Sequence, residues 1–142
     1  MTVLRNTTVI HCTQELAFDY LSDMRNELEW NPSVQVVEKL TDGPVGVGTR
    51  FRAKWKGGPP VEVTMVGYDR PVAWEAHNGG PLEVVFKAGL EPVGEGTKLT
   101  VDFDVRPHRF FRLVFPLFLL KLRRDEKANM THIREALERR KG

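Results

Sequence analysis

Glu126 is the residue whose type and position most clearly suggest chemistry in this sequence. It falls within a stripe of apolar residues at helical spacing near the C-terminus. The other residues of this stripe are Phe115, Leu119, Leu122, Met130, Ile133 and Leu137. A buried carboxylate is costly unless it is paired or hydrogen-bonded. The position therefore indicates either a ligand-binding or acid/base carboxyl group with a raised pKa, or a carboxylate at the rim that pairs with Arg123 or Arg52. Asn129 lies beside the same stripe and is a second candidate for orienting a ligand.

The element that must position Glu126 is one long C-terminal helix. No glycine interrupts the chain from Phe110 to Lys141, and every residue from Pro116 onward tolerates a helix. We expect Pro116 to kink this helix or to start it afresh. Such a helix must be buried by the part of the chain that precedes Pro107.

The first part of this helix, Phe110–Leu120, is apolar nearly all round. Phe110, Leu113, Leu117 and Leu120 lie off the main stripe. A helix of this kind buries a second face elsewhere. We expect a homodimer interface, a lid over a cavity, or a peripheral membrane contact, and the basic residues that follow Leu120 suit anionic headgroups.

The residues before Pro107 predict short strands joined by turns rich in Gly and Pro. Residues 49–56 alternate cleanly between apolar and basic, which is typical of an antiparallel strand with one wet face. The strands are expected at residues 2–11, 34–40, 49–56, 61–65, 72–77, 82–90 and 98–105. Two short helices are expected at residues 14–24, capped by Thr13, and 25–30. The whole chain, residues 1–142, is predicted to be a single α+β domain with a meandering antiparallel sheet.

Composition excludes several classes of function. The formal net charge is +2, which is too small an excess to indicate nucleic acid as a partner. A single cysteine, Cys12, forbids an intrachain disulfide and is compatible with a reducing compartment. The most apolar run, Phe110–Leu122, is shorter than the roughly 20 residues that span a bilayer. We therefore expect a cytoplasmic protein, with peripheral membrane contact as the alternative.

The sequence contains no recognisable catalytic, metal or cofactor motif. The four histidines show no metal-ligand spacing, and neither serine occupies a nucleophile motif. Gly43, Gly46 and Gly48 precede an expected strand rather than a helix, so they do not form a phosphate-binding loop. No catalytic residue, metal or cofactor is predicted.

The chain resembles the START-like (SRPBCC) superfamily, and within it the polyketide cyclase/dehydrase-like and lipid-transport branch. The resemblance rests on turn and packing motifs and covers essentially the whole sequence. The motifs are Ala17–Asp23, Trp30-Asn31-Pro32, Gly46–Phe51, Asp69-Arg70-Pro71 and Gly96–Val101. The resemblance implies a helix-grip fold, in which about seven antiparallel strands wrap around the C-terminal helix. Such motifs specify a fold better than a function.

The resemblance also implies a cavity between the sheet and the helix. Its apolar lining suits a lipid, an aromatic molecule or a polyketide-like molecule, bound for transport or sequestration. The expected ligand-binding residues are Trp30, Phe51, Trp55, Met65, Trp74, Phe86, Phe103, Leu119, Leu122, Glu126 and Met130. Two alternatives stay open. One is a cyclase/dehydrase-type enzyme that uses Glu126 as acid/base, and the other is a membrane-associated quinone or lipid chaperone.

Overall fold

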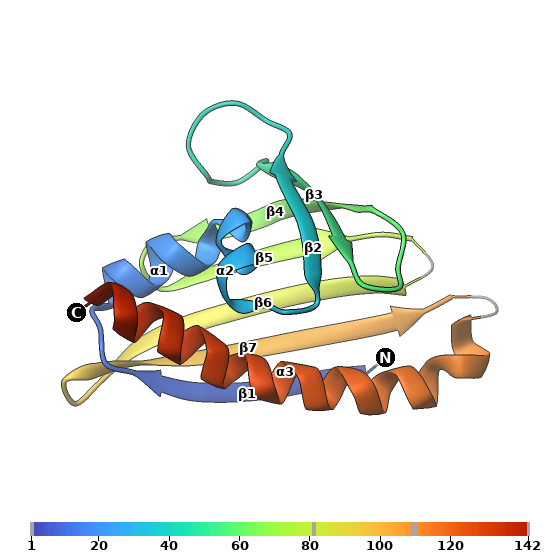
Figure 1. Cartoon of the computed structure of the whole chain (residues 1–142). Helices are drawn as coiled ribbons and strands as arrows, with labels where there is room; N and C mark the ends of the chain where they lie inside the picture. Colours follow the sequence, from blue (N-terminus) through green and yellow to red (C-terminus); the bar gives the residue numbers. More distant parts are fainter. Residues whose placement is uncertain (1, 81, 109–110, 142) are drawn as a thin grey trace.

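The computed structural model describes residues 2–80, 82–108 and 111–141, and in this part seven antiparallel strands form one curved sheet beside a long helix (Figure 1). The strands are β1 (Thr2–Ile10), β2 (Val34–Lys39), β3 (Arg50–Trp55), β4 (Val61–Asp69), β5 (Ala73–Asn78), β6 (Leu82–Val93) and β7 (Gly96–Pro107). They follow the order β1-β7-β6-β5-β4-β3-β2, so the sheet is a meander to which β1 adds at one edge. The predicted helix-grip α+β architecture is confirmed.

Alternation along the strands separates a concave inner face from a wet outer face. In β3, Phe51 and Ala53 are buried while Arg50 and Arg52 are exposed, as the period of two predicts. On the outer face Arg50 pairs with Glu62 of β4 at 3.2 Å, between Nη1 and Oε1. Exposed pairs of this kind contribute little stability, so the sheet depends mainly on its buried face.

The longest pairing in the sheet joins β6 to β7. Its register places Phe86 opposite Phe103 and Leu90 opposite Leu99. Where β7 begins, Gly96 lies against the end of β1: a Cβ atom added to Gly96 would lie 2.7 Å from the carbonyl oxygen of Ile10. A glycine at this position therefore lets the two strands approach each other.

Two short helices follow β1 and cover one end of the sheet. Helix α1 spans Gln14–Ser22, and Thr13 caps it by accepting a hydrogen bond from the backbone N–H of Leu16 at 3.2 Å. A 3₁₀ turn, η1 (Met24–Asn26), then leads into helix α2 (Glu27–Trp30). The expected helix 25–30 is thus a 3₁₀ turn followed by one α-helical turn, which ends before Pro32.

The long helix α3 spans Phe111–Lys141 and packs against β1, β7 and α2. It continues through Pro116, so of the two alternatives expected at this residue a fresh start is wrong, whereas a kink stays a prediction; Phe110 lies outside the described residues. Its C-terminal half carries the apolar stripe as predicted, because Met130, Ile133 and Leu137 are buried.

Polar contacts hold the C-terminal end of α3 on the short helices and the end of β1. The backbone N–H of His11 donates to Oε2 of Glu138 at 3.0 Å. The guanidinium of Arg140 lies 4.6 Å from the ring centroid of Tyr20, and its Nη2 donates to Oε2 of Glu29 at 3.2 Å. These contacts fix the position of α3 relative to α1 and α2.

Candidate functional site

A row of aromatic side chains crosses the inner face of the sheet. Phe18 of α1 contacts both Tyr68 and Trp74 edge to face, at ring-centroid distances of 5.0 and 5.2 Å. Trp74 contacts Phe86 at 6.3 Å, and Phe86 contacts Phe103 at 5.1 Å. The row therefore extends from β4 across β5 and β6 to β7. Edge-to-face contacts of this kind fix the orientations of the rings as well as burying them.

The sequence-predicted ligand-binding residues fall into two groups by burial. Phe51, Met65, Trp74 and Met130 are buried. Trp30, Trp55, Phe86, Phe103, Leu119, Leu122 and Glu126 are half-buried.

One cluster brings six of these residues together. Met65, Trp74 and Met130 belong to the hydrophobic core, and Trp30, Phe86 and Phe103 pack against it. The two β3 residues, Phe51 and Trp55, and the two α3 leucines, Leu119 and Leu122, are not part of that cluster.

Half-burial of large inward-facing side chains is the notable feature of this inner face. Phe103 alternates with the buried Val101 and Val105 on β7, so it points to the same concave side. It is nevertheless half-buried, as is Phe86 opposite it. Helix α3 and the short helices therefore leave part of the concave aromatic surface accessible.

Two carboxyl groups lie at the contact between α2 and α3. Glu126 of α3 is the residue expected from the apolar stripe, and burial raises its pKa to about 7, with a further contribution from the negative charge of Asp125. Glu27 of α2 was not expected. Burial raises the pKa of Glu27 to about 8, and the charge of Glu126 adds to this effect. The two carboxyl groups therefore share one low-dielectric environment.

Amide side chains, rather than cations, accompany this carboxyl pair. The side-chain amide of Asn129 lies near the carboxyl group of Glu126, and that of Asn31 lies near Glu27; each amide lowers the pKa of its carboxyl group against the effect of burial. Asn129 is buried, and its Oδ1 lies 3.2 Å from Nδ1 of His132. Asn129 is therefore buried beside Glu126, and its role in orienting a ligand stays a prediction.

No described Lys, Arg or His side chain forms an ion pair with Glu27 or Glu126. The rim alternative for Glu126 required an ion pair with Arg123 or Arg52. Arg52 lies 3.6 Å from Glu38 instead, and Arg123 forms no ion pair with Glu126 in the described structure. In addition, the Oε2 atom of Glu27 is buried without a hydrogen-bond partner. This part of the molecule therefore has an unsatisfied acceptor next to a second carboxyl group.

Sequence reasoning missed Glu27 because α2 is too short to show a period. One signal was present: Glu27 lies three residues before Trp30, which was expected to line the site, and residues three apart share a helix face. That no cation pairs with Glu126 could be seen only in the tertiary structure.

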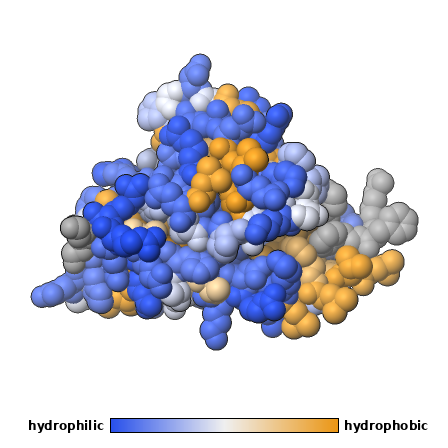
Figure 2. All heavy atoms as spheres, viewed as in Figure 1, coloured by the Kyte–Doolittle hydropathy of each residue, from blue (hydrophilic) through white to orange (hydrophobic). Residues whose placement is uncertain are grey.

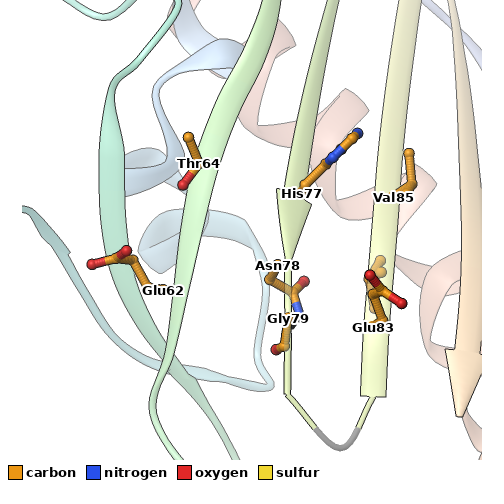
Figure 3. A pocket seen from close by; sticks show the side chains of 8 residues that line it. Glu62, Thr64, His77, Asn78, Gly79, Glu83 and Val85 are labelled. Atoms are coloured by element: carbon orange, nitrogen blue, oxygen red, sulfur yellow. Dashed lines mark hydrogen bonds between the residues drawn. The ribbon is translucent and has the colours of Figure 1, made fainter. Parts of the chain in front are cut away.

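A separate shallow pocket of about 470 Å³ opens on the outer face of the sheet (Figure 3). Its lining includes Glu62, Thr64, His77, Glu83 and Val85. These positions alternate with inward residues such as Val63 and Met65, so the pocket lies on the opposite side from the aromatic row. The interactions there are exposed, and His77 simply contacts Glu75 at 2.6 Å.

The N-terminal half of α3 exposes a strongly apolar surface. Leu113, Leu117 and Leu120 are 81%, 74% and 66% exposed, and Val114 is also exposed. Figure 2 shows hydrophobic atoms projecting at this end of the helix, at the lower right of the view. Within the described part of the chain, no helix is long and apolar enough to cross a membrane. We call the surface formed by Leu113, Val114, Leu117 and Leu120 the apolar helix face.

Comparison with known proteins agrees with this architecture. A family model described as "Polyketide cyclase / dehydrase and lipid transport" matches residues 1–138. The search of functionally curated proteins found no relative by sequence.

Solved structures with the same fold are distant in sequence. A protein from Thermus thermophilus is 16% identical, with a TM-score of 0.79 over 96% of this chain and 97% of its own. The Zhui aromatase/cyclase from Streptomyces sp. R1128 is 15% identical, with a TM-score of 0.75 over 99% and 96%. The Aha1 dimer from Colwellia psychrerythraea is 15% identical, with a TM-score of 0.72 over 100% of both chains. At these identities the likeness establishes the fold alone.

Proposed function

Because the chain belongs to the polyketide cyclase/dehydrase and lipid transport family, we propose that it binds a small hydrophobic molecule between its sheet and α3. The role proposed for this binding is transport or sequestration of a lipid, an aromatic molecule or a polyketide-like molecule. The observation that carries the proposal is the half-buried aromatic surface at Phe86 and Phe103 on the concave face. Apolar, concave surfaces with few polar groups are typical of small-molecule sites.

Native mass spectrometry of freshly purified protein tests this proposal, followed by denaturing extraction of any bound molecule. We expect an apolar adduct that Ala76→Phe removes, because Ala76 faces Phe86 across the β5–β6 pairing. Val85→Phe is the matched control, since Val85 lies on the outer face and should leave the adduct unchanged. An apo mass, together with no uptake from fatty acids, quinones and aromatic polyketides, would contradict the proposal.

A second candidate function is proton transfer in a cyclase/dehydrase-type reaction, with Glu126 as acid/base. The observation that favours it is the buried carboxyl group with a pKa of about 7, a value at which a group can both donate and accept a proton near neutral pH. In that case Glu126→Gln abolishes turnover of a bound polyketide while ligand binding persists. Full turnover by Glu126→Gln would exclude this role.

We further propose that the protein docks on an anionic membrane surface through the apolar helix face, in the manner of a lipid or quinone chaperone. Lys121, Arg123 and Arg124 follow the exposed leucines directly, so cationic and apolar groups meet on one helix. This combination suits the boundary between headgroups and acyl chains.

Flotation with phosphatidylcholine vesicles, with and without phosphatidylserine, tests membrane docking. We expect salt-sensitive binding to the anionic vesicles that Leu117→Ser with Leu120→Ser removes. Val47→Ser is the control, because Val47 is equally exposed on the β2–β3 loop. Absence of vesicle binding at low salt would contradict docking. A wild-type dimer that the same double variant dissociates would instead assign the apolar helix face to a homodimer.

A further inference from the structure

The carboxyl pair formed by Glu27 and Glu126 has an arrangement that a filled protein core does not require. The two groups come from different helices and meet where α2 contacts α3. Replacing either residue by an apolar one would remove a buried polar group from the protein. Oε2 of Glu27 is buried with no hydrogen-bond donor. Buried acceptors of this kind are normally satisfied, so this one calls for a partner that the chain itself does not supply.

The chemistry of that partner follows from the charge around the pair. The neighbouring amides of Asn31 and Asn129 provide hydrogen bonds but no positive charge. None of the described cations near these helices pairs with Glu27 or Glu126: Lys121 lies 2.7 Å from Asp125, and Arg140 lies 3.2 Å from Glu29. A cationic donor is the complement of the pair in its ionised form, because a buried charge requires a pairing partner.

The apolar surroundings distinguish between kinds of cation. Leu122 and Met130 lie one helical turn on either side of Glu126, and Trp30 lies one turn from Glu27. Calcium and magnesium take six or more oxygen ligands, whereas the described side chains form no group of three or more His, Cys, Asp and Glu. An ammonium group has three N–H donors and needs only three acceptors.

We propose that Glu27 and Glu126 form the polar end of the ligand site and bind the ammonium group of an apolar amine. This inference rests on the proposed hydrophobic-ligand function and names the class of ligand. The apolar part of such a ligand lies along Leu122, Met130 and the aromatic row, and the ammonium group donates to Oε2 of Glu27 and to the carboxylate of Glu126. Asn31 and Asn129 hold the two carboxylates in position.

Calorimetric titration with three matched probes, n-octylamine, n-octanol and n-octanoate, tests this proposal. Each probe is an unbranched eight-carbon molecule, and the three differ in their head groups. The shape of the site should therefore affect their affinities equally. We expect octylamine to bind at least about ten-fold more tightly than octanol at pH 8, which corresponds to about 1.4 kcal/mol. Octanoate should bind more weakly than octanol, because it would add a third carboxylate.

Variants of Glu27 and Glu126 separate recognition of the probe's head group from binding of its alkyl chain. In Glu27→Gln with Glu126→Gln, octylamine and octanol should bind within about three-fold of each other, and octanol should keep its wild-type affinity. Glu29→Gln is the control, because Glu29 is on the same helix but pairs with Tyr20 and Arg140 outside the site. Circular dichroism and the unfolding temperature verify that each variant is folded.

The possible outcomes distinguish this inference from the proposed function. Equal affinity of wild-type protein for all three probes would overturn the amine proposal and leave the hydrophobic site standing. A preference for octylamine that survives in the double Gln variant would also overturn it. Binding of none of the probes would contradict both proposals.

Discussion

Glu27 in α2 and Glu126 in α3 lie close enough for the charge of Glu126 to raise the pKa of Glu27. The two residues are far apart in the sequence, and only the packing of the short helix on the long helix brings them together. Both carboxyl groups are more acidic in the unfolded chain, where water solvates them, than in the folded protein. This difference couples folding to proton binding, so the state of the two carboxyl groups can be followed through the pH dependence of stability.

The first prediction concerns the pH dependence of stability. Both folded-state pKa values, about 8 for Glu27 and about 7 for Glu126, lie above the unfolded value of 4.5. The folded state therefore binds more protons between these limits, and its stability falls as pH rises from about 5 to about 8. We expect the free energy of unfolding in urea to fall by on the order of a few kcal/mol over this range.

The double variant Glu27→Gln, Glu126→Gln is the control for this prediction. Neighbouring acids such as Asp125 and Glu29 are paired with Lys121 and Arg140 and remain in the variant. Asp19 has a lowered pKa beside Arg70, so its contribution to stability is lost only as pH falls below about 4. The fall between pH 5 and 8 should therefore disappear in the variant. An identical slope in both proteins would show that the pair is hydrated or otherwise paired.

The second prediction concerns ligand binding and follows from the same proton equilibrium. An alkylamine, like lysine, stays protonated up to roughly pH 10, whereas the carboxyl pair, with pKa values of about 7 and about 8, loses its protons between about pH 6 and 9. The affinity for octylamine should therefore rise from about pH 6 to about pH 9 and then level off. Octanol affinity should change little over this interval. An octylamine affinity that falls as pH rises would contradict binding to the carboxylates.

The third prediction concerns the junction of β1 and β7. A Cβ at Gly96 would lie 2.7 Å from the carbonyl oxygen of Ile10, so Gly96→Ala must push two paired strands apart. We expect a loss of about 1–3 kcal/mol in the free energy of unfolding. Gly46→Ala is the matched control, because no atom lies within 4 Å of its added Cβ. Equal stability of the two variants would show that the junction relaxes freely.

The fourth prediction compares the two halves of α3. Leu137 is completely buried, so Leu137→Ala should cost about 2–5 kcal/mol of stability. Leu117 is 74% exposed, and Leu117→Ala should change stability by less than about 0.5 kcal/mol. Thermal unfolding of both variants measures the difference. A large loss in Leu117→Ala would mean that this leucine is covered, as in a dimer.

Much of the fold could be predicted from local patterns. A period of two identified the strands because one face of the sheet is buried and the other is wet, as Phe51 and Arg52 show. The residue before Pro32 marked the end of the second short helix, and Thr13 marked the start of the first. The burial of Met130 and Ile133 followed from helical spacing.

The candidate site was predictable only in part. Glu126 could be identified because it interrupts a long apolar stripe. Glu27 could not, because a single turn of helix has no period, and its environment depends on a residue from the far end of the chain. The half-burial of Phe86 and Phe103 likewise depends on how α3 covers the sheet, which is a tertiary property.

The first half of α3 is exposed and its second half is buried, so the two halves tolerate different substitutions. Changes at Met130, Ile133 or Leu137 alter the core and are limited by foldability. Changes at Leu113, Leu117 or Leu120 leave the core intact and alter only the contacts that this surface can make with other molecules. Substitutions in the first half of this helix can therefore adapt the protein to different surroundings, while the second half preserves the core of the fold. One continuous helix thus combines an adaptable segment with a fixed one.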